Sequence, residues 1–231
     1  MPGKIYGVGV GPGDPELMTL KAVRLMEEAD VLAIPSKDRE SCAAYKIAAG
    51  AVKGLSEKEV LPVVFPMTKD ETLLEKSHEK GAAAVSALLD RGKTVVFLTL
   101  GDPTVYSTYM YLHKRLISMG YEPEIVSGVP SFCAAAAKLS VSLGEKAESI
   151  HILPGSYPVE EGLSLSGTKV LMKSGKQLKQ VKQILLSRGE HAVMAENCGM
   201  DGERLVLETE LIPEDAGYYS LVIVKEREET R

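Results

Sequence analysis

The chain has 231 residues, of which 45% are hydrophobic and 26% are charged, and its formal net charge is -5. This composition is typical of an ordinary soluble protein with one large or two small cores, and the acidic balance argues against a nucleic-acid partner. No apolar run approaches the length of a membrane span and no charged-then-apolar leader opens the chain, so we expect a cytoplasmic protein without a membrane partner. The three cysteines are far apart and lack histidines at metal spacing, which predicts buried thiols and no metal site.

The first predicted elements are an apolar strand over residues 5–9, a glycine-rich turn, and a helix over residues 19–28. Glycines in such a turn allow the backbone to approach a ligand closely. Pro12 stands where a G-x-G-x-x-G fingerprint starting at Gly7 needs its third glycine, and Ile5 stands where the common Rossmann methyltransferases carry an acidic residue. The turn therefore favours neither a nicotinamide site nor a Rossmann methyltransferase.

Strands and helices alternate through the rest of the first half of the chain. The predicted strands cover residues 31–35, 60–65, 94–98 and 124–126, and the predicted helices cover residues 42–52, 70–90, 105–119 and 133–139. This alternation predicts a parallel sheet covered by helices.

The most convincing strand, over residues 94–98, has no charges and is rich in Val, as a buried parallel strand should be. A Gly101-Asp102-Pro103 turn follows it closely. Ligands of open α/β sheets bind outside the carboxyl ends of the strands, so we expect a ligand first at residues 101–106. Asp102 also fits a purely structural role at the start of the next helix, with Pro103 at the first helical position, and both interpretations stay open.

The pattern changes near Ser140. Further strands are predicted over residues 149–153, 169–172, 192–196, 204–207 and 218–224, with one long helix over residues 176–188. Such a pattern is typical of a mixed sheet in a second domain, and residues 225–231 are expected to form a polar tail. We therefore predict an α/β chain with an N-terminal domain over residues 1–139 and a C-terminal domain over residues 140–231.

Four motifs in this chain carry a resemblance to a known family. They are G-x-G-P-G-D-P-E-L-x-T from residue 9, L-T-L-G-D-P from residue 98, S-G-V-P-S-F from residue 127 and A-E-N from residue 195. In this order and spacing they resemble the tetrapyrrole methylases, the S-adenosylmethionine-dependent enzymes of cobalamin and sirohaem synthesis. Within that family, the stretches D-P-T-V-Y-S-T-Y and S-K-D-R-E-S-C-A-A-Y are most similar to the precorrin-2 and cobalt-precorrin-2 C20-methyltransferases.

The resemblance implies a two-domain fold, with a mostly parallel N-terminal sheet, a mixed C-terminal sheet and a cofactor cleft between the domains. It also implies a homodimer that methylates C20 of precorrin-2 or cobalt-precorrin-2. The motif positions that would contact S-adenosylmethionine are Pro12, Leu100, Gly101, Asp102, Val105, Tyr106, Ser131, Phe132, Met172, Lys173, Asn197 and Cys198.

The implied reaction does not require a reactive side chain from the protein. Methyl transfer from a sulfonium is an in-line displacement, in which positioning supplies much of the rate. A reduced tetrapyrrole is electron-rich at its meso carbons, so no protein nucleophile is required and no catalytic side chain is singled out. The four histidines are scattered along the chain, and we expect them to be surface or capping residues.

The carboxylates of such a substrate would be met by cationic side chains. Lys37 and Arg39, just beyond the second strand, are the candidates, and the alternative is that they are solvated loop charges. Met110 and Leu112 are candidates for a dimer interface or for the core. Two other functions stay open: another enzyme of this architecture, such as a uroporphyrinogen-III methyltransferase or a diphthine synthase, or a non-catalytic cofactor-binding homologue.

Overall fold

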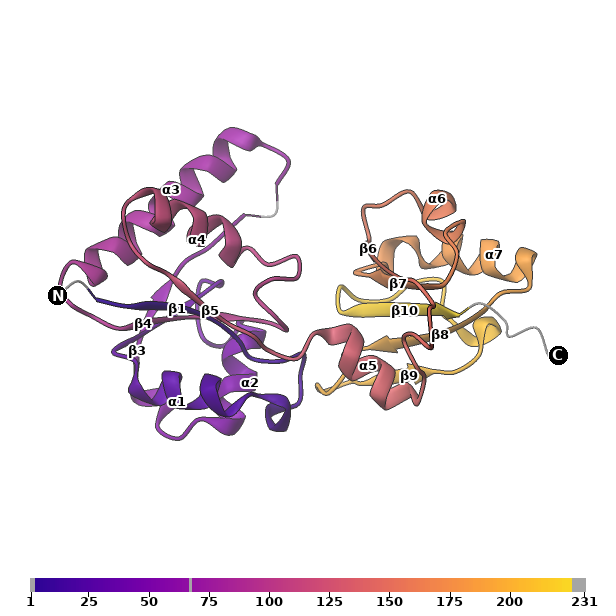
Figure 1. Cartoon of the computed structure of the whole chain (residues 1–231), viewed down its shortest axis with the longest axis horizontal. Helices are drawn as coiled ribbons and strands as arrows, with labels where there is room; N and C mark the ends of the chain where they lie inside the picture. Colours follow the sequence, from indigo (N-terminus) through magenta and orange to yellow (C-terminus); the bar gives the residue numbers. More distant parts are fainter. Residues whose placement is uncertain (1–2, 67, 226–231) are drawn as a thin grey trace. The chain divides into compact units, whose positions relative to one another are not determined.

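The computed structural model describes residues 3–66 and 68–225, and the chain divides into two compact units, residues 1–130 and residues 131–231 (Figure 1). No helix in the described ranges has both the length and the apolar character needed to cross a membrane. The division falls before the predicted boundary at residues 139 and 140. The reason is that the helix α5 (Ser131–Leu139) packs on strands of the second unit.

The first unit contains a five-stranded parallel sheet of order β3-β2-β4-β1-β5. Its strands are β1 (Ile5–Gly9), β2 (Val31–Ile34), β3 (Glu59–Pro62), β4 (Val95–Thr99) and β5 (Glu124–Val126). Its α-helices are α1 (Leu20–Glu28), α2 (Ala43–Ala51), α3 (Glu71–Leu89) and α4 (Tyr109–Ser118), with short 3-10 turns η1 (Pro15–Leu17) and η2 (Leu55–Glu57). The parallel sheet and its covering helices are as predicted.

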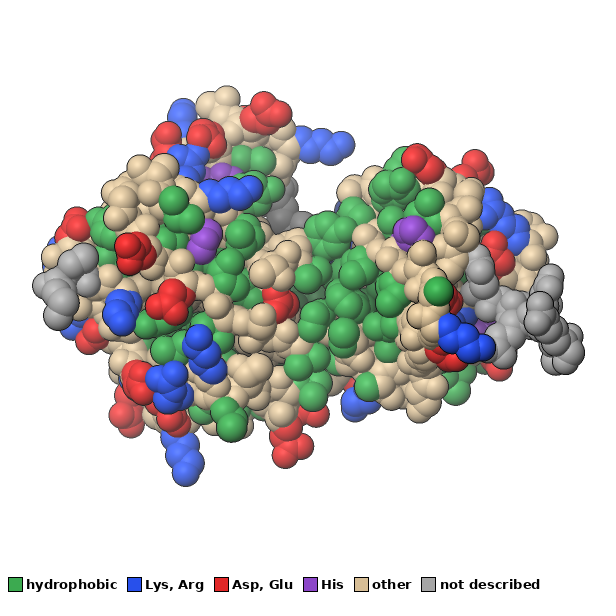
Figure 2. Space-filling view, in the orientation of Figure 1, with side chains coloured by type: hydrophobic (Ala, Val, Ile, Leu, Met, Phe, Trp, Pro, Cys, Tyr) green, Lys and Arg blue, Asp and Glu red, His purple; other side chains and the backbone are tan. Residues whose placement is uncertain are grey.

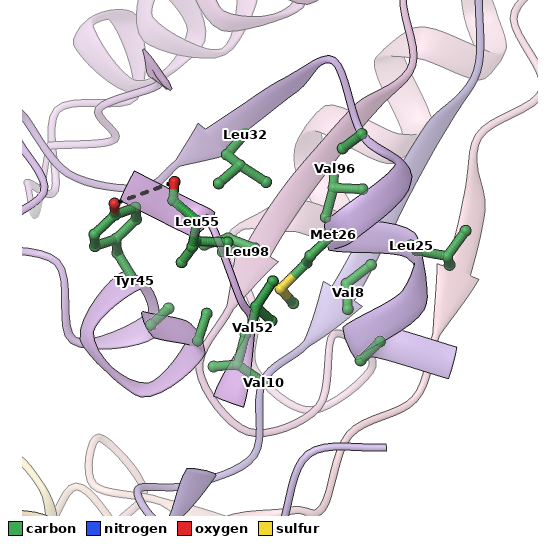
Figure 3. Close-up of a cluster of buried hydrophobic side chains, with 14 of the residues drawn as sticks. Val8, Val10, Leu25, Met26, Leu32, Tyr45, Val52, Leu55, Val96 and Leu98 are labelled. Atoms are coloured by element: carbon green, nitrogen blue, oxygen red, sulfur yellow. Dashed lines mark hydrogen bonds between the residues drawn. The ribbon is translucent and has the colours of Figure 1, made fainter. Parts of the chain in front are cut away.

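Two separate cores pack on the two faces of this sheet. Helices α1 and α2 cover one face and α3 and α4 cover the other (Figure 1). Figure 3 shows part of the first core, in which Met26 of α1 lies with Val96 and Leu98 of β4. Because side chains alternate along a strand, β4 contributes to both cores, and all five of its residues are buried.

Polar side chains set the starts of two helices in this unit. The Thr19 hydroxyl accepts a hydrogen bond from Ala22 N at the start of α1, at 3.2 Å, and the Asp70 carboxylate accepts one from Leu73 N at the start of α3, at 3.1 Å. Each bond satisfies an amide that has no partner within its helix. Both helices begin within one residue of the predicted position.

The helix after the Gly-Asp-Pro turn begins later than predicted. The sequence favours a helix from Val105, whereas α4 begins at Tyr109. Tyr106 has a left-handed backbone, with φ of 47°, which a right-handed helix does not contain. The Ser107 hydroxyl then accepts a hydrogen bond from Tyr109 N at 3.1 Å. The turn after β4 is therefore a longer loop, and Val105 and Tyr106 belong to that loop.

The second unit contains a mixed five-stranded sheet of order β6-β7-β10-β8-β9. Its strands are β6 (Ile150–Pro154), β7 (Thr168–Met172), β8 (His191–Glu196), β9 (Arg204–Val206) and β10 (Ser220–Lys225). Only the β6–β7 pair is parallel, and the other pairs are antiparallel. Besides α5 the unit holds α6 (Val159–Leu163), α7 (Leu178–Arg188) and the 3-10 turns η3 (Gly175–Gln177) and η4 (Thr209–Leu211).

Two details of the second unit differ from the sequence-based expectation. The short helix α6 was not predicted, because five residues carry no helical periodicity that can be recognised. Lys225 belongs to β10 and its ammonium lies 2.7 Å from the Glu148 carboxylate, so it is not part of a tail. The remaining predicted tail, residues 226–231, lies outside the described residues.

One strand of the second sheet contains a buried lysine. The side chain of Lys169 on β7 is only 3% exposed, and its ammonium lies 3.9 Å from the Glu190 carboxylate. Arg188 approaches the other oxygen of Glu190 at 3.7 Å. This arrangement keeps the buried positive charge close to a negative one.

Candidate functional site

Three glycine backbones meet at the carboxyl edge of the parallel sheet. Gly9 ends β1, Gly101 follows β4, and Gly128 follows β5. A Cβ atom added to Gly9 would lie 2.4 Å from the Gly101 carbonyl oxygen, and one added to Gly128 would lie 2.2 Å from the same oxygen. These distances leave no room for a side chain, so the three loops approach through their backbones alone.

Backbone hydrogen bonds join the glycine-rich turn after β1 to the turn after β4. Gly101 N donates to the Gly11 carbonyl at 2.8 Å, Gly11 N donates back to the Gly101 carbonyl at 3.3 Å, and Val10 N donates to the Thr99 carbonyl at 2.9 Å. Both glycines have positive φ, 78° for Gly11 and 70° for Gly101. Pro12, which follows directly, is buried. The predicted residues Pro12 and Gly101 are thus brought together, although they come from distant parts of the sequence.

The Asp102 carboxylate links the loop after β4 to the loop after β5 through hydrogen bonds. One oxygen accepts hydrogen bonds from Thr104 N at 2.7 Å and from the Thr104 hydroxyl at 2.5 Å, and the other accepts from Gly128 N at 3.0 Å. Burial alone would raise the pKa of Asp102, but hydrogen bonds from Thr104, Gly128 and Ser127 outweigh it and hold the pKa below the usual 3.8. The prediction that Asp102 starts the next helix, with Pro103 at the first helical position, is wrong, because α4 begins only at Tyr109. The carboxylate instead bonds backbone N–H groups of the loops after β4 and β5, and a cofactor contact by this residue stays a prediction.

Asp102→Asn is expected to lower the free energy of unfolding by about 1–3 kcal/mol at pH 7, because an amide NH2 replaces one of the two acceptor oxygens. The contribution of the carboxylate is present above the unfolded pKa of 3.8 and is lost as the pH falls through the lower folded pKa. Urea unfolding of both proteins at about pH 7 and about pH 3 measures it. A stability difference that stays constant over that range would contradict the assignment.

The other predicted residues of the first unit lie on the same loop. Leu100 and Val105 are half-buried, and Leu100 packs on the core beneath α1 and α2. Tyr106 is 50% exposed, which leaves its ring accessible to a ligand. Sequence reasoning did not single out Gly128, although it lies within the S-G-V-P-S-F motif that signalled this loop.

The predicted residues of the second unit lie at the ends of two strands and at the start of helix α5. Met172 ends β7 and Lys173 follows it, Asn197 and Cys198 follow β8, and Ser131 and Phe132 form the first turn of α5. Strand β10 lies between β7 and β8: Lys173 N donates to the Ser220 carbonyl at 3.0 Å, and Asn197 N donates to the Tyr219 carbonyl at 3.1 Å. Lys173 and Asn197 thus flank the start of β10, and both have positive φ, 58° and 50°.

A further group at this end of the second sheet was not identified from the sequence. One Glu196 oxygen accepts a hydrogen bond from Gly217 N at 2.5 Å, and the other lies 2.7 Å from the Arg204 guanidinium. The Lys173 ammonium lies 5.2 Å from the centre of the Tyr218 ring. Glu196 therefore anchors the segment before β10, and the A-E-N motif marks that anchor.

The two cationic candidates differ in their surroundings. Arg39 donates to the carbonyls of Ser56 at 2.8 Å and Lys58 at 2.6 Å, and its guanidinium lies 5.5 Å from the centre of the Tyr45 ring. Lys37 is 79% exposed, and its ammonium lies 3.8 Å from Asp38. Arg39 is thus engaged in holding its loop, and Lys37 is the better placed of the two for a ligand. On the face in view, Lys and Arg side chains of the first unit are interspersed with Asp and Glu (Figure 2).

The expectation for the histidines and cysteines was only partly right. His78 is buried and stacks on the Tyr111 ring at 4.7 Å, and burial lowers its pKa, so it is a core residue and not a surface or capping one. Cys42 and Cys198 are buried as predicted, whereas Cys133 is exposed on α5. Within residues 3–66 and 68–225, no three His, Cys, Asp or Glu side chains are grouped to hold a metal ion.

The comparison with known families decides the identity of this fold. The family model described as Tetrapyrrole (Corrin/Porphyrin) Methylases matches residues 4–211. The chain belongs to the tetrapyrrole methylase family. The fold class and the family resemblance predicted from the sequence are therefore confirmed.

The similarity of this tetrapyrrole methylase to known proteins extends over almost its whole chain. It is 35% identical over 227 residues to a Methanocaldococcus jannaschii protein named probable cobalt-precorrin-2 C(20)-methyltransferase, with 96% of each chain covered. It is 33% identical to a Sinorhizobium precorrin-2 C(20)-methyltransferase, and the matched region covers 96% of this chain and 95% of the relative. Among solved structures, the Thermus thermophilus uroporphyrin-III C-methyl transferase complexed with S-adenosylhomocysteine is 26% identical, with a TM-score of 0.70 and 97% and 98% of the two chains covered.

Proposed function

We propose that this tetrapyrrole methylase transfers a methyl group from S-adenosylmethionine to C20 of precorrin-2 or cobalt-precorrin-2 in cobalamin biosynthesis. The observation that carries the proposal is the similarity over nearly the whole chain to two proteins named as C20-methyltransferases, one for each form of the substrate. The solved Thermus thermophilus relative with S-adenosylhomocysteine supports the choice of cofactor.

The residues at the carboxyl edge of the parallel sheet suit such a reaction. S-adenosylmethionine would supply the methyl group. The electron pair of the meso carbon would form the new C–C bond as the S–CH3 bond breaks, S-adenosylhomocysteine would leave, and the carbon would then lose its proton. The close glycine contacts place backbone groups, rather than side chains, beside Leu100 and Gly101. Asp102 uses its carboxylate to hold these loops in one arrangement. The protein's contribution is then to hold the two reactants in line, which can supply much of the rate.

The proposal is tested by incubating the protein with S-adenosylmethionine labelled in its methyl group and with precorrin-2, with and without cobalt. We expect one labelled methyl per product, located at C20 by NMR. A parallel reaction with uroporphyrinogen III tests the alternative activity within the same family. Label on uroporphyrinogen III alone would replace the proposal, and S-adenosylhomocysteine binding without turnover on any tetrapyrrole would favour a non-catalytic homologue.

We also propose that the protein acts in the cytoplasm as a homodimer. Of the two interface candidates from the sequence, Leu112 lies in the core and Met110 packs against it. Tyr111, Ile117 and Met119 are instead about half exposed on α4 and at its end, which supports an apolar contact there. Sedimentation at micromolar concentration is expected to give the mass of two chains. The mass of one chain would remove the dimer from the proposal.

A further inference from the structure

The hydroxyl of Thr99 is buried and has no hydrogen-bond partner. Thr99 is the last residue of β4, is only 6% exposed, and its Oγ1 bonds to nothing in the described parts of the chain. A buried hydroxyl without a partner is unfavourable, and native proteins contain few of them. An unpartnered group of this kind at the candidate site indicates that something outside the chain completes it.

Thr99 lies at the point of the sheet where ligands of open α/β folds bind. By strand alternation its side chain shares a face with Val95 and Phe97, which pack under α3 and α4. The helix that follows β4 covers that face, whereas the helices that follow the neighbouring strands β1 and β2 cover the opposite face. The end of β4 is thus a topological switch point, where the loops of adjacent strands run to opposite faces of the sheet, and ligands of open α/β sheets bind at such points.

We infer that Thr99 Oγ1 hydrogen-bonds S-adenosylmethionine at the carboxyl edge of the parallel sheet, an inference that rests on the proposed function. The Thr99 carbonyl already bonds Val10 N, so the residue lies between the turn that carries Pro12 and the turn that carries Gly101. Its hydroxyl can donate and accept, which matches the ribose hydroxyls and the amino-acid carboxylate of the cofactor. The many carboxylates of the tetrapyrrole are better matched by cationic side chains.

The inference is tested with Thr99→Val, which keeps the shape of the side chain but removes the hydroxyl, and with Thr99→Ser, which keeps the hydroxyl. We expect calorimetry to give a dissociation constant for S-adenosylhomocysteine that is about tenfold higher for Thr99→Val and within about threefold of the wild type for Thr99→Ser. Thr94→Val is the matched control and should bind as the wild type does, because Thr94 is half-buried and directly precedes β4, at the opposite end from Thr99.

A second measurement separates a ligand contact from a structural role. Because the hydroxyl is unpartnered without ligand, Thr99→Val should have an unliganded melting temperature at least as high as the wild type. A lower melting temperature would overturn the inference, because it would show that the hydroxyl already has a partner in the unliganded protein. Unchanged S-adenosylhomocysteine affinity would also overturn it, even if the KM for the tetrapyrrole rises. Failure of the wild type to bind S-adenosylhomocysteine would instead contradict the proposed function itself.

Discussion

Gly128→Ala is expected to weaken S-adenosylhomocysteine binding by more than about 100-fold, because displacement of a binding loop by about 1 Å is enough for a loss of that size. The added methyl group would lie 2.2 Å from the Gly101 carbonyl oxygen and 2.8 Å from the Gly9 backbone. Neither neighbour is a flexible side chain that can turn away. The loops after β1, β4 and β5 must therefore separate, at a cost in stability of about 1–3 kcal/mol.

Gly120→Ala is the matched control for this substitution. Gly120 also lies in the first unit, has a φ of 89°, and has no atom within 4 Å of an added Cβ. Its replacement strains the backbone without moving a neighbour, so it should lower stability slightly and leave binding unchanged. Calorimetric titration of both variants with S-adenosylhomocysteine, alongside circular dichroism, gives the comparison. Normal binding by Gly128→Ala would show that this edge of the sheet is not the cofactor site.

Glu190→Gln is expected to lower the free energy of unfolding by about 3–5 kcal/mol. Lys169 would then have no carboxylate partner at a site that is 3% exposed, because an uncharged amide would stand where the carboxylate lies 3.9 Å away. Most of the penalty comes from the unpaired buried ammonium. The double variant Lys169→Met with Glu190→Gln should therefore recover most of the loss, since the charge is removed as well. Urea unfolding followed by circular dichroism measures all three proteins.

Glu214→Gln is the control that shows whether the effect of Glu190→Gln comes from the burial of the ion pair or from the distance between its charges. Glu214 lies 3.0 Å from Lys179, closer than the buried pair, but the two side chains are 64% and 63% exposed. Exposed pairs of this kind contribute about 0–1 kcal/mol because water screens both charges. An equal effect of Glu214→Gln and Glu190→Gln would show that the burial of Lys169 does not decide the outcome.

Most strands and helices could be predicted because their signals are local. The uncharged, Val-rich run that ends at Leu98 predicts β4, and Thr19 and Asp70 mark helix starts through their own side chains. The start of α4 could not be predicted in this way. It depends on the positive φ of Tyr106 and on the bonds of Asp102 to Thr104 and Gly128, and the second of those bonds joins distant parts of the chain.

The candidate site was only partly predictable for the same reason. Gly101 and Asp102 stand out in the sequence because their turn follows the most apolar strand. The position of Gly128 leaves no room for a side chain because of loops from other parts of the chain, which the local sequence does not reveal. In the same way, the missing partner of the Thr99 hydroxyl depends on every atom around it. Arg39 looked like a substrate ligand because its loop follows a strand, but its guanidinium is already bonded to two carbonyls from residues 56 and 58.

The position of β4 has a consequence for how the first unit folds. Strands β1 and β2 come first in the sequence, yet they do not pair with each other, and each pairs with β4. The β1–β4 register joins residue 5 to residue 95, so a long stretch of chain must close into a loop before this pairing stabilises anything. Such high contact order slows folding. A fragment that stops before residue 95 would hold neither a central sheet nor a ligand edge, because both need β4.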